Sequence, residues 1–329
     1  MKQRTTTKTS NNGHVNNNNP DADGATPSQT PNEPSHRNQR GGGGVGRRAR
    51  IVKYEDAPRY LQDNPWIRSG YRIEHSFVEC LRSLFHFRHN ETGNIWSHFL
   101  GLWFFFVVTF YTLFRFHFHE ELAAVASWED EAVFLLFLVC TQFCMAMSTC
   151  YHLFMCHSAE AYVVCIRMDL SGISAMITGS FYPTIYYIFA SAPSWRFFYL
   201  ATISLFAILS IAGPFLPAFH TARFRKTRVM LYGSMALFGL MPTVHTVLLH
   251  DWSVASGIIG RLCVMFASYI AGLTFYATKF PEKWWPGRFD IWFHSHQWWH
   301  VFGFLGALAQ FWAALHCFNT RHLLCPSCF

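Results

Sequence analysis

Hydrophobic residues in this chain gather in long runs that are separated by short polar stretches. Each run is close to the roughly 20 residues that a helix needs to cross the hydrocarbon core of a bilayer. Because backbone polar groups in lipid must be satisfied within the segment itself, such runs predict helices. We expect seven spanning helices, over residues 94–114, 132–154, 170–190, 197–217, 229–249, 256–278 and 296–318.

The composition agrees with this pattern. Hydrophobic residues make up 51% of the 329 residues and charged residues only 14%, a balance that soluble domains of this length do not show. The predicted fold class is therefore an all-α membrane protein with seven transmembrane helices. Membrane lipids are its expected surroundings, and we expect no nucleic-acid partner. Residues such as Gly179 and Pro183 inside the runs are tolerated where neighbouring helices satisfy the backbone.

Lysine and arginine residues are distributed unevenly between the runs, which predicts an orientation. If the N-terminus is cytosolic, ten of them flank the inner ends of the spans and four flank the outer ends. We therefore expect a cytosolic N-terminus and a lumenal or extracellular C-terminus, the reverse of a rhodopsin-type receptor. The inner residues are Arg82, Arg88, Arg167, Arg223, Arg225, Lys226, Arg228, Lys279, Lys283 and Arg288, and the outer ones are Arg115, Arg196, Arg261 and Arg321.

Histidines lie where two of the runs reach the predicted cytosolic face. His296 and His300 are four residues apart, so a helix places both rings on one side, and His152 closes the second run. Three imidazoles with an open fourth position are typical of a catalytic zinc site. We interpret these three as zinc ligands. At the same predicted depth, Asp169 is a candidate to hold a water or act as general base, and Ser148, one turn before His152, is a candidate to hydrogen-bond to the water, a substrate carbonyl or a neighbouring group.

Structural explanations compete with this interpretation. The histidine pair on its own is equally compatible with simple helix packing. Asp169 at the start of the third run could instead be a helix N-cap or a partner for Arg167. We interpret His98 as a helix-contact residue without a role at the site. His294 precedes His296 by two residues and is expected to point away from the pair.

The chain outside the runs divides into further parts. Apolar residues at 77, 81, 84 and 85 fall near helical spacing, which predicts an amphipathic helix within residues 74–88 on the inner membrane surface. The first 50 residues are rich in Asn, Thr, Gly and Pro and are expected to be disordered. We therefore expect a disordered cytosolic tail (1–50), a juxtamembrane segment with the amphipathic helix (51–93), the seven-helix domain (94–318) and a lumenal tail (319–329).

Cysteines contribute little to the prediction. Most of the ten lie in or beside the runs and behave as small apolar residues. Cys325 and Cys328 instead lie on the predicted lumenal side, where an oxidising compartment permits a disulfide. Free or lipidated thiols are the alternative for this pair.

Five short motifs stand out: NETGNIWSH at 90–98, Ser148 followed by His152, DLSG at 169–172, PEKWWPG at 281–287 and SHQWWH at 295–300. Together they resemble the progestin and adipoQ receptor family, which includes the adiponectin receptors, over about residues 50–320. The resemblance implies seven helices, a cytosolic N-terminus and a zinc bound by three histidines near the cytosolic face. It also implies that His152, His296 and His300 are the ligands, with Asp169 as the water-holding carboxylate and Ser148 beside them.

Further stretches resemble particular branches of that family. The segments at 54–71 and 151–154 and the ending at 321–326 are most similar to a Golgi-resident branch of the family, which restrains Raf-type kinases in MAP kinase signalling. That similarity implies residence in the Golgi membrane and a Raf-type kinase at the cytosolic N-terminal region. The stretches at 92–96 and 289–293 resemble adiponectin receptors equally well, which implies a hormone ligand and the plasma membrane as the alternative location.

Two functions from different classes follow from these features. The first, which we take as the working function, is a zinc-binding membrane receptor or scaffold that holds a signalling partner at its cytosolic face. The alternative is a zinc-dependent hydrolase that attacks the amide of a lipid such as a ceramide, an activity that the resemblance to adiponectin receptors implies. An open metal position favours catalysis, although a bound zinc also pins helices together.

Overall fold

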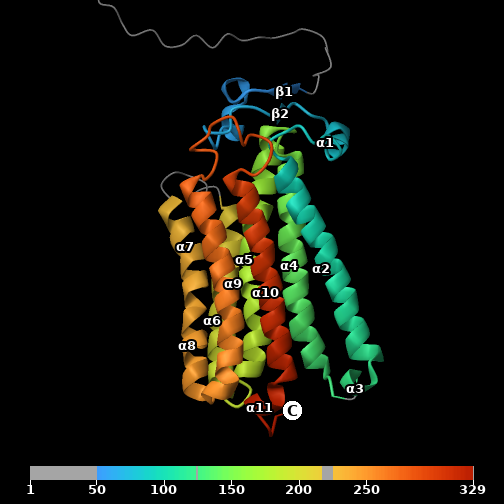
Figure 1. Ribbon diagram of the computed structural model, residues 1–329, viewed down its shortest axis with the longest axis vertical. Coiled ribbons are helices and arrows are strands. Elements are labelled where there is room, and N and C mark those ends of the chain that lie inside the picture. Colours follow the sequence, from blue (N-terminus) through green and yellow to red (C-terminus); the bar gives the residue numbers. More distant parts are fainter. Residues whose placement is uncertain (1–49, 124, 217–224, 329) are drawn as a thin grey trace, which may run out of the picture. The chain divides into compact units, whose positions relative to one another are not determined.

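The computed structural model describes residues 50–123, 125–216 and 225–328. Among these residues, seven helical spans are long and apolar enough to cross a membrane, and they run side by side as a bundle (Figure 1). The predicted seven-helix membrane fold is confirmed. The long helices are α2 (Thr92–Phe118), α4 (Trp128–Phe154), α5 (Ala159–Ile188), α6 (Pro193–Ala212), α7 (Arg225–Phe238) with α8 (Leu240–Leu249), α9 (Trp252–Thr278) and α10 (Ser295–Asn319).

Shorter elements join and cover these helices. Helices α7 and α8 follow one another directly and together form a single span. Cys325 and Cys328, after the last short helix, form a disulfide. The shorter elements are β1 (Arg50–Val52), β2 (Tyr71–Ile73), α1 (Phe77–Ser83), α3 (Glu120–Ala123), α11 (Arg321–Leu324) and the 3-10 helices Tyr54–Asp56, Arg59–Leu61 and Gly213–Phe215.

The third span differs most from its predicted position. Helix α5 begins at Ala159 rather than at residue 170, because the Ser158 hydroxyl accepts a hydrogen bond from the backbone N–H of Ala161 and caps the helix there. Asp169 therefore lies well inside the helix, and its interpretation as an N-cap is wrong. Residues 1–49 of the predicted disordered tail (1–50) and Arg223 lie outside the described residues, while Arg50 begins β1.

A hairpin that the hydrophobic pattern does not reveal begins the described chain. Strands β1 and β2 pair in antiparallel register, with Arg50 opposite Ile73, and they lie at the end of the bundle where α2 and α10 begin (Figure 1). We call residues 50–90 the cap. Its apolar side chains pack with the end of α4, in a cluster of Ala57, Leu61, Ile67, Tyr71, Ile73, Tyr151 and Met155.

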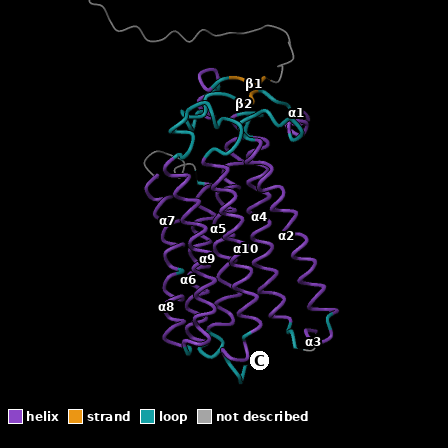
Figure 2. The backbone as a smooth tube through the Cα atoms, in the orientation of Figure 1, coloured by secondary structure: helices purple, strands orange, loops and turns teal. Residues whose placement is uncertain are grey.

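Helix α1 lies in the cap (Figure 2) and covers residues 77–83, within the range 74–88 where the hydrophobic pattern predicts a helix. It begins with a capping box, in which Ser76 and Glu79 exchange side-chain and backbone hydrogen bonds. It ends at Ser83, and the next carbonyl, that of Leu84, accepts a hydrogen bond from the indole N–H of Trp96 at 2.9 Å. Its apolar side chains Phe77, Val78 and Leu81 are more than half exposed, as an amphipathic helix on a membrane surface requires.

Two buried carboxylates join the cap to the segment between α9 and α10. Asp290 accepts a hydrogen bond from the Ser69 hydroxyl at 2.6 Å. Glu282 accepts one from the Asn64 side chain at 3.0 Å and another from the backbone N–H of Ser295, the first residue of α10, at 2.8 Å. A negative charge at a helix N-terminus is favourable. These bonds therefore hold the first turn of α10 in place.

Helices α4 and α5 approach each other closely at glycines of α5. A Cβ atom built at Gly179 would lie 2.7 Å from the Cβ atom of Cys140, and one at Gly172 would lie 2.9 Å from the Cα atom of Cys144. Small residues allow membrane helices to pack backbone against backbone, which gains van der Waals contact where lipid supplies no hydrophobic driving force. This contact keeps the end of α4 beside α5.

Replacing Gly179 by Ala should destabilise the bundle by about 1–3 kcal/mol, because the added methyl group overlaps Cys140 and forces the two helices apart. The measurement is the thermal unfolding temperature of the purified protein in lipid nanodiscs. Gly260→Ala is the matched control, since a Cβ atom there meets nothing within 4 Å. Equal unfolding temperatures for the two variants would contradict tight packing at this contact.

Candidate metal centre

Three imidazole rings meet at the end of the bundle that carries the cap. His152 belongs to the last turn of α4, and His296 and His300 belong to the first two turns of α10. One candidate ligand atom from each residue lies within 4.8 Å of the other two, and the three ring centres are 4.8 to 5.0 Å apart. The structure thus brings together the three histidines that the sequence analysis selected.

The ring nitrogens of this group fit a metal ion. The Nδ1 atom of His300 lies 3.1 Å from the Asn94 carbonyl oxygen, which only accepts, so that nitrogen carries the proton. The Nε2 atom of His152 is buried without a hydrogen-bond partner, an arrangement that costs about 1–3 kcal/mol unless something binds there. Neutral imidazoles with free lone pairs, a few ångströms apart, form the donor set of a transition-metal site.

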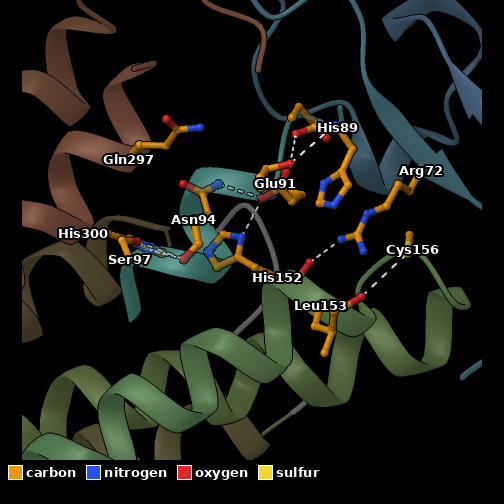
Figure 3. A network of polar contacts seen from close by, with 12 residues as sticks. Arg72, His89, Glu91, Asn94, Ser97, His152, Leu153, Cys156, Gln297 and His300 are labelled. Carbon is orange, nitrogen blue, oxygen red and sulfur yellow. Dashed lines mark hydrogen bonds and ion pairs between the residues drawn. The ribbon is translucent and has the colours of Figure 1, made fainter. Parts of the chain in front are cut away.

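Glu91 holds the ring of His152 (Figure 3). Its Oε2 atom lies 2.7 Å from His152 Nδ1 and also accepts a hydrogen bond from the Asn94 side chain at 2.7 Å. Burial raises the pKa of Glu91, but the hydrogen bonds from His152 and Asn94 outweigh it and hold the pKa below its ordinary value. Sequence reasoning did not assign Glu91. The available signal was a carboxylate in the polar turn before the first span, at the depth of His152.

His300 is held by residues of α2. Its Nδ1 atom lies 3.2 Å from the Ser97 hydroxyl, and the ring of His98 stacks on its ring with centres 3.8 Å apart and planes 10° from parallel. His98 is therefore a helix-contact residue, as interpreted, but the side chain it contacts is one of the three central histidines. Helix α2 thus packs against the centre and contributes none of the three imidazoles.

Asp169 and Ser148 lie beside the centre rather than within it. Their side chains are close enough to interact with each other, and Asp169 is also close enough to His152 to interact with it electrostatically. Asp169 does not belong to the group of atoms within 4.8 Å. His294 is turned away, as predicted, and its Nε2 atom lies 3.0 Å from the Asn90 carbonyl oxygen.

Arg72, a buried residue of strand β2, holds the backbone at His152. Its guanidinium donates to the His152 carbonyl oxygen at 2.5 Å and also to the Ser83 hydroxyl. Burial and the nearby Arg72 lower the pKa of His89 to about 3, so this neighbouring imidazole is neutral at physiological pH. No motif marked Arg72 in the sequence. The cap and α2 therefore hold His152 from two sides, by its carbonyl and by its ring.

Replacing Arg72 by Met should lower stability by about 1–3 kcal/mol, because it leaves the His152 carbonyl and the Ser83 hydroxyl without this donor. Thermal unfolding in nanodiscs measures the effect. Arg50→Met is the control on the neighbouring strand, since its ion pair with Glu74 is 3.3 Å long and its side chain is 61% exposed. Exposed pairs of this kind contribute little. A similar loss in both variants would argue against a special role for the buried arginine.

Comparisons with known proteins give consistent results. The chain matches the model of a family described as Haemolysin-III related over residues 86–311. It is 36% identical over 286 residues to heptahelical transmembrane protein 1 of Arabidopsis thaliana, with 85% of each chain covered. It is 34% identical over 288 residues to progestin and adipoQ receptor family member 3 of Mus musculus (84% of this chain, 89% of that protein). It is 32% identical over 265 residues to the adiponectin receptor protein of Drosophila melanogaster (80% and 58%).

Proposed function

Because this chain belongs to the Haemolysin-III related family, together with the progestin and adipoQ receptors, we propose that it is a seven-helix membrane receptor or scaffold built around a zinc centre. His152, His296 and His300 would bind the ion. The observation that supports this most directly is the convergence of three imidazoles around a buried ring nitrogen that has no protein partner. With the N-terminus in the cytosol, as the positive charges predict, the centre lies at the cytosolic leaflet.

The receptor role has two sources of support. The similarity to an adiponectin receptor protein favours a hormone ligand on the outer side. The resemblance to the Golgi-resident branch favours the Golgi membrane, with the plasma membrane as the alternative, and a Raf-type kinase at the cytosolic N-terminal region. In this role the zinc would be mainly structural, because it joins α4 to α10 and, through Glu91, both to α2.

Asp169 and Ser148 favour a second candidate function, the hydrolysis of a lipid amide such as a ceramide. A bound zinc would acidify a water and polarise the amide carbonyl. Asp169 would take a proton from the attacking water while the Ser148 hydroxyl holds the carboxylate in place. The water oxygen bonds to the carbonyl carbon, the C–N bond breaks, and Asp169 passes its proton to the leaving amine. The products are a fatty acid and an amine.

His296→Ala and His300→Ala should each reduce zinc from about one ion per chain to a small fraction of that, because two imidazoles cannot complete the tetrahedral set. Inductively coupled plasma mass spectrometry on protein purified without chelators provides the measurement. His322→Ala is the control, since His322 is exposed at the opposite end of the bundle. Unchanged zinc in the first two variants would refute the ligand assignment.

Asp169→Asn should slow hydrolysis of a fluorescent ceramide by at least about 100-fold, because a carboxamide cannot accept the proton. The zinc content should stay at the wild-type level. Single-turnover assays in nanodiscs measure the rate, and Asp251→Asn, at an exposed aspartate on the opposite end, is the control. If zinc-loaded wild type shows no turnover, the hydrolase candidate fails and the receptor or scaffold function stands alone.

A further inference from the structure

We propose that Glu91 is the positioning residue of the metal centre. Its carboxylate accepts the Nδ1–H of His152 and thereby keeps the Nε2 atom of that ring directed at the other two imidazoles. The inference rests on the proposed zinc centre and adds the residue that directly precedes α2, a helix that provides none of the three imidazoles. Glu91 would act through His152 and would not itself contact the ion.

The tautomer of His152 follows from the contacts of its two ring nitrogens. An ionised carboxylate is an acceptor only, so the 2.7 Å contact requires a proton on Nδ1. If Nε2 carried a second proton, that N–H would be buried without an acceptor and would face two more imidazoles. A neutral ring with a free Nε2 lone pair avoids this cost. The hydrogen bond to Glu91 therefore selects the tautomer that binds a metal.

The backbone around Glu91 fixes how far its side chain reaches. Its carbonyl accepts the first hydrogen bond of α2, from the N–H of Ile95 at 2.9 Å. The preceding residue, Asn90, donates its N–H to the Gly70 carbonyl at 3.0 Å and accepts from His294 Nε2 at 3.0 Å. The cap and the start of α10 thus hold the turn from both sides. The carboxylate is placed in advance of any metal binding.

The carboxylate itself is held by Asn94, one turn further along α2. The Asn94 side chain donates to the same Oε2 atom at 2.7 Å (Figure 3). Only 13% of the Glu91 side chain and 3% of the His152 side chain are exposed, so water competes little for these bonds. A carboxylate that accepts from a metal-binding imidazole orients the ring and makes it a stronger base. Loss of such a partner typically weakens metal affinity by about 10- to 100-fold.

The test compares full-length wild type, Glu91→Gln and Glu91→Ala in nanodiscs, stripped of metal and titrated with zinc against a competing chelator. We expect Glu91→Ala to bind zinc about 10- to 100-fold more weakly. Glu91→Gln keeps an acceptor oxygen but not the charge, so its affinity should fall between those of Ala and wild type. Asp290→Asn is the matched control, because Asp290 is a buried, hydrogen-bonded carboxylate at the same end that contacts no imidazole of the centre.

Other outcomes would overturn the inference. If the Glu91 variants keep wild-type zinc affinity while their metal-free forms unfold at lower temperature, Glu91 merely joins α2 to α4. If the Glu91 variants do not fold, Asn94→Ala provides the second measurement, since it should weaken zinc binding by freeing the carboxylate. Unchanged affinity in Asn94→Ala would then count against positioning. If wild type binds no zinc, the proposed centre fails, and the positioning role fails with it.

Discussion

The site depends on how the polar groups of His152 are satisfied at the edge of a hydrophobic bundle. Its backbone carbonyl is paired with Arg72, its Nδ1 atom with Glu91, and only its Nε2 atom is left without a protein partner. Buried polar groups are normally paired, so an unpaired ring nitrogen on a ring that packs against two more imidazoles marks a place where a ligand would bind. The two contacts come from β2 and from the turn before α2, and they hold the cap and the start of α2 against the end of α4.

The same principle explains how the start of α10, which carries the other two histidines, is held in place. Helix α10 presents two histidines in its first two turns, where orphan backbone N–H groups would otherwise be exposed. Glu282 accepts a hydrogen bond from one of these N–H groups, that of Ser295. It also brings a negative charge to the positive end of the helix. Because Glu282 is also bonded to Asn64, the position of the histidine pair is set by residues outside the span. The geometry of the centre therefore depends on the segments outside the spans as well as on the helices.

Much of this arrangement could be predicted from local sequence. Length and apolarity alone locate all seven spans, because a bilayer imposes a minimum helix length. The spacing of His296 and His300 places them on one helix face, and the end of the second run brings His152 to the same depth. These predictions use only short stretches of sequence, and the structure shows both the seven spans and the group of three histidines.

Other features depend on pairings that no local pattern encodes. The strands around Arg50 and Arg72 are three residues long, too short for alternation to be visible. Helix α5 starts early because a single serine caps it, which rules out the competing interpretation of Asp169 as a helix N-cap. Glu91 and Arg72 carry no special spacing in the sequence, since each acquires its importance from His152, a residue more than sixty positions away.

The bond between Asn64 and Glu282 joins residues 218 positions apart, and it bears on the order in which the molecule is assembled. During synthesis the segment before the first span leaves the ribosome long before the last helix does. Contacts of such long range can form only after the intervening chain is in place. The bond between Asn64 and Glu282 must therefore wait until the segment after α9 has been made, and the three imidazoles can meet only once α10 has followed it.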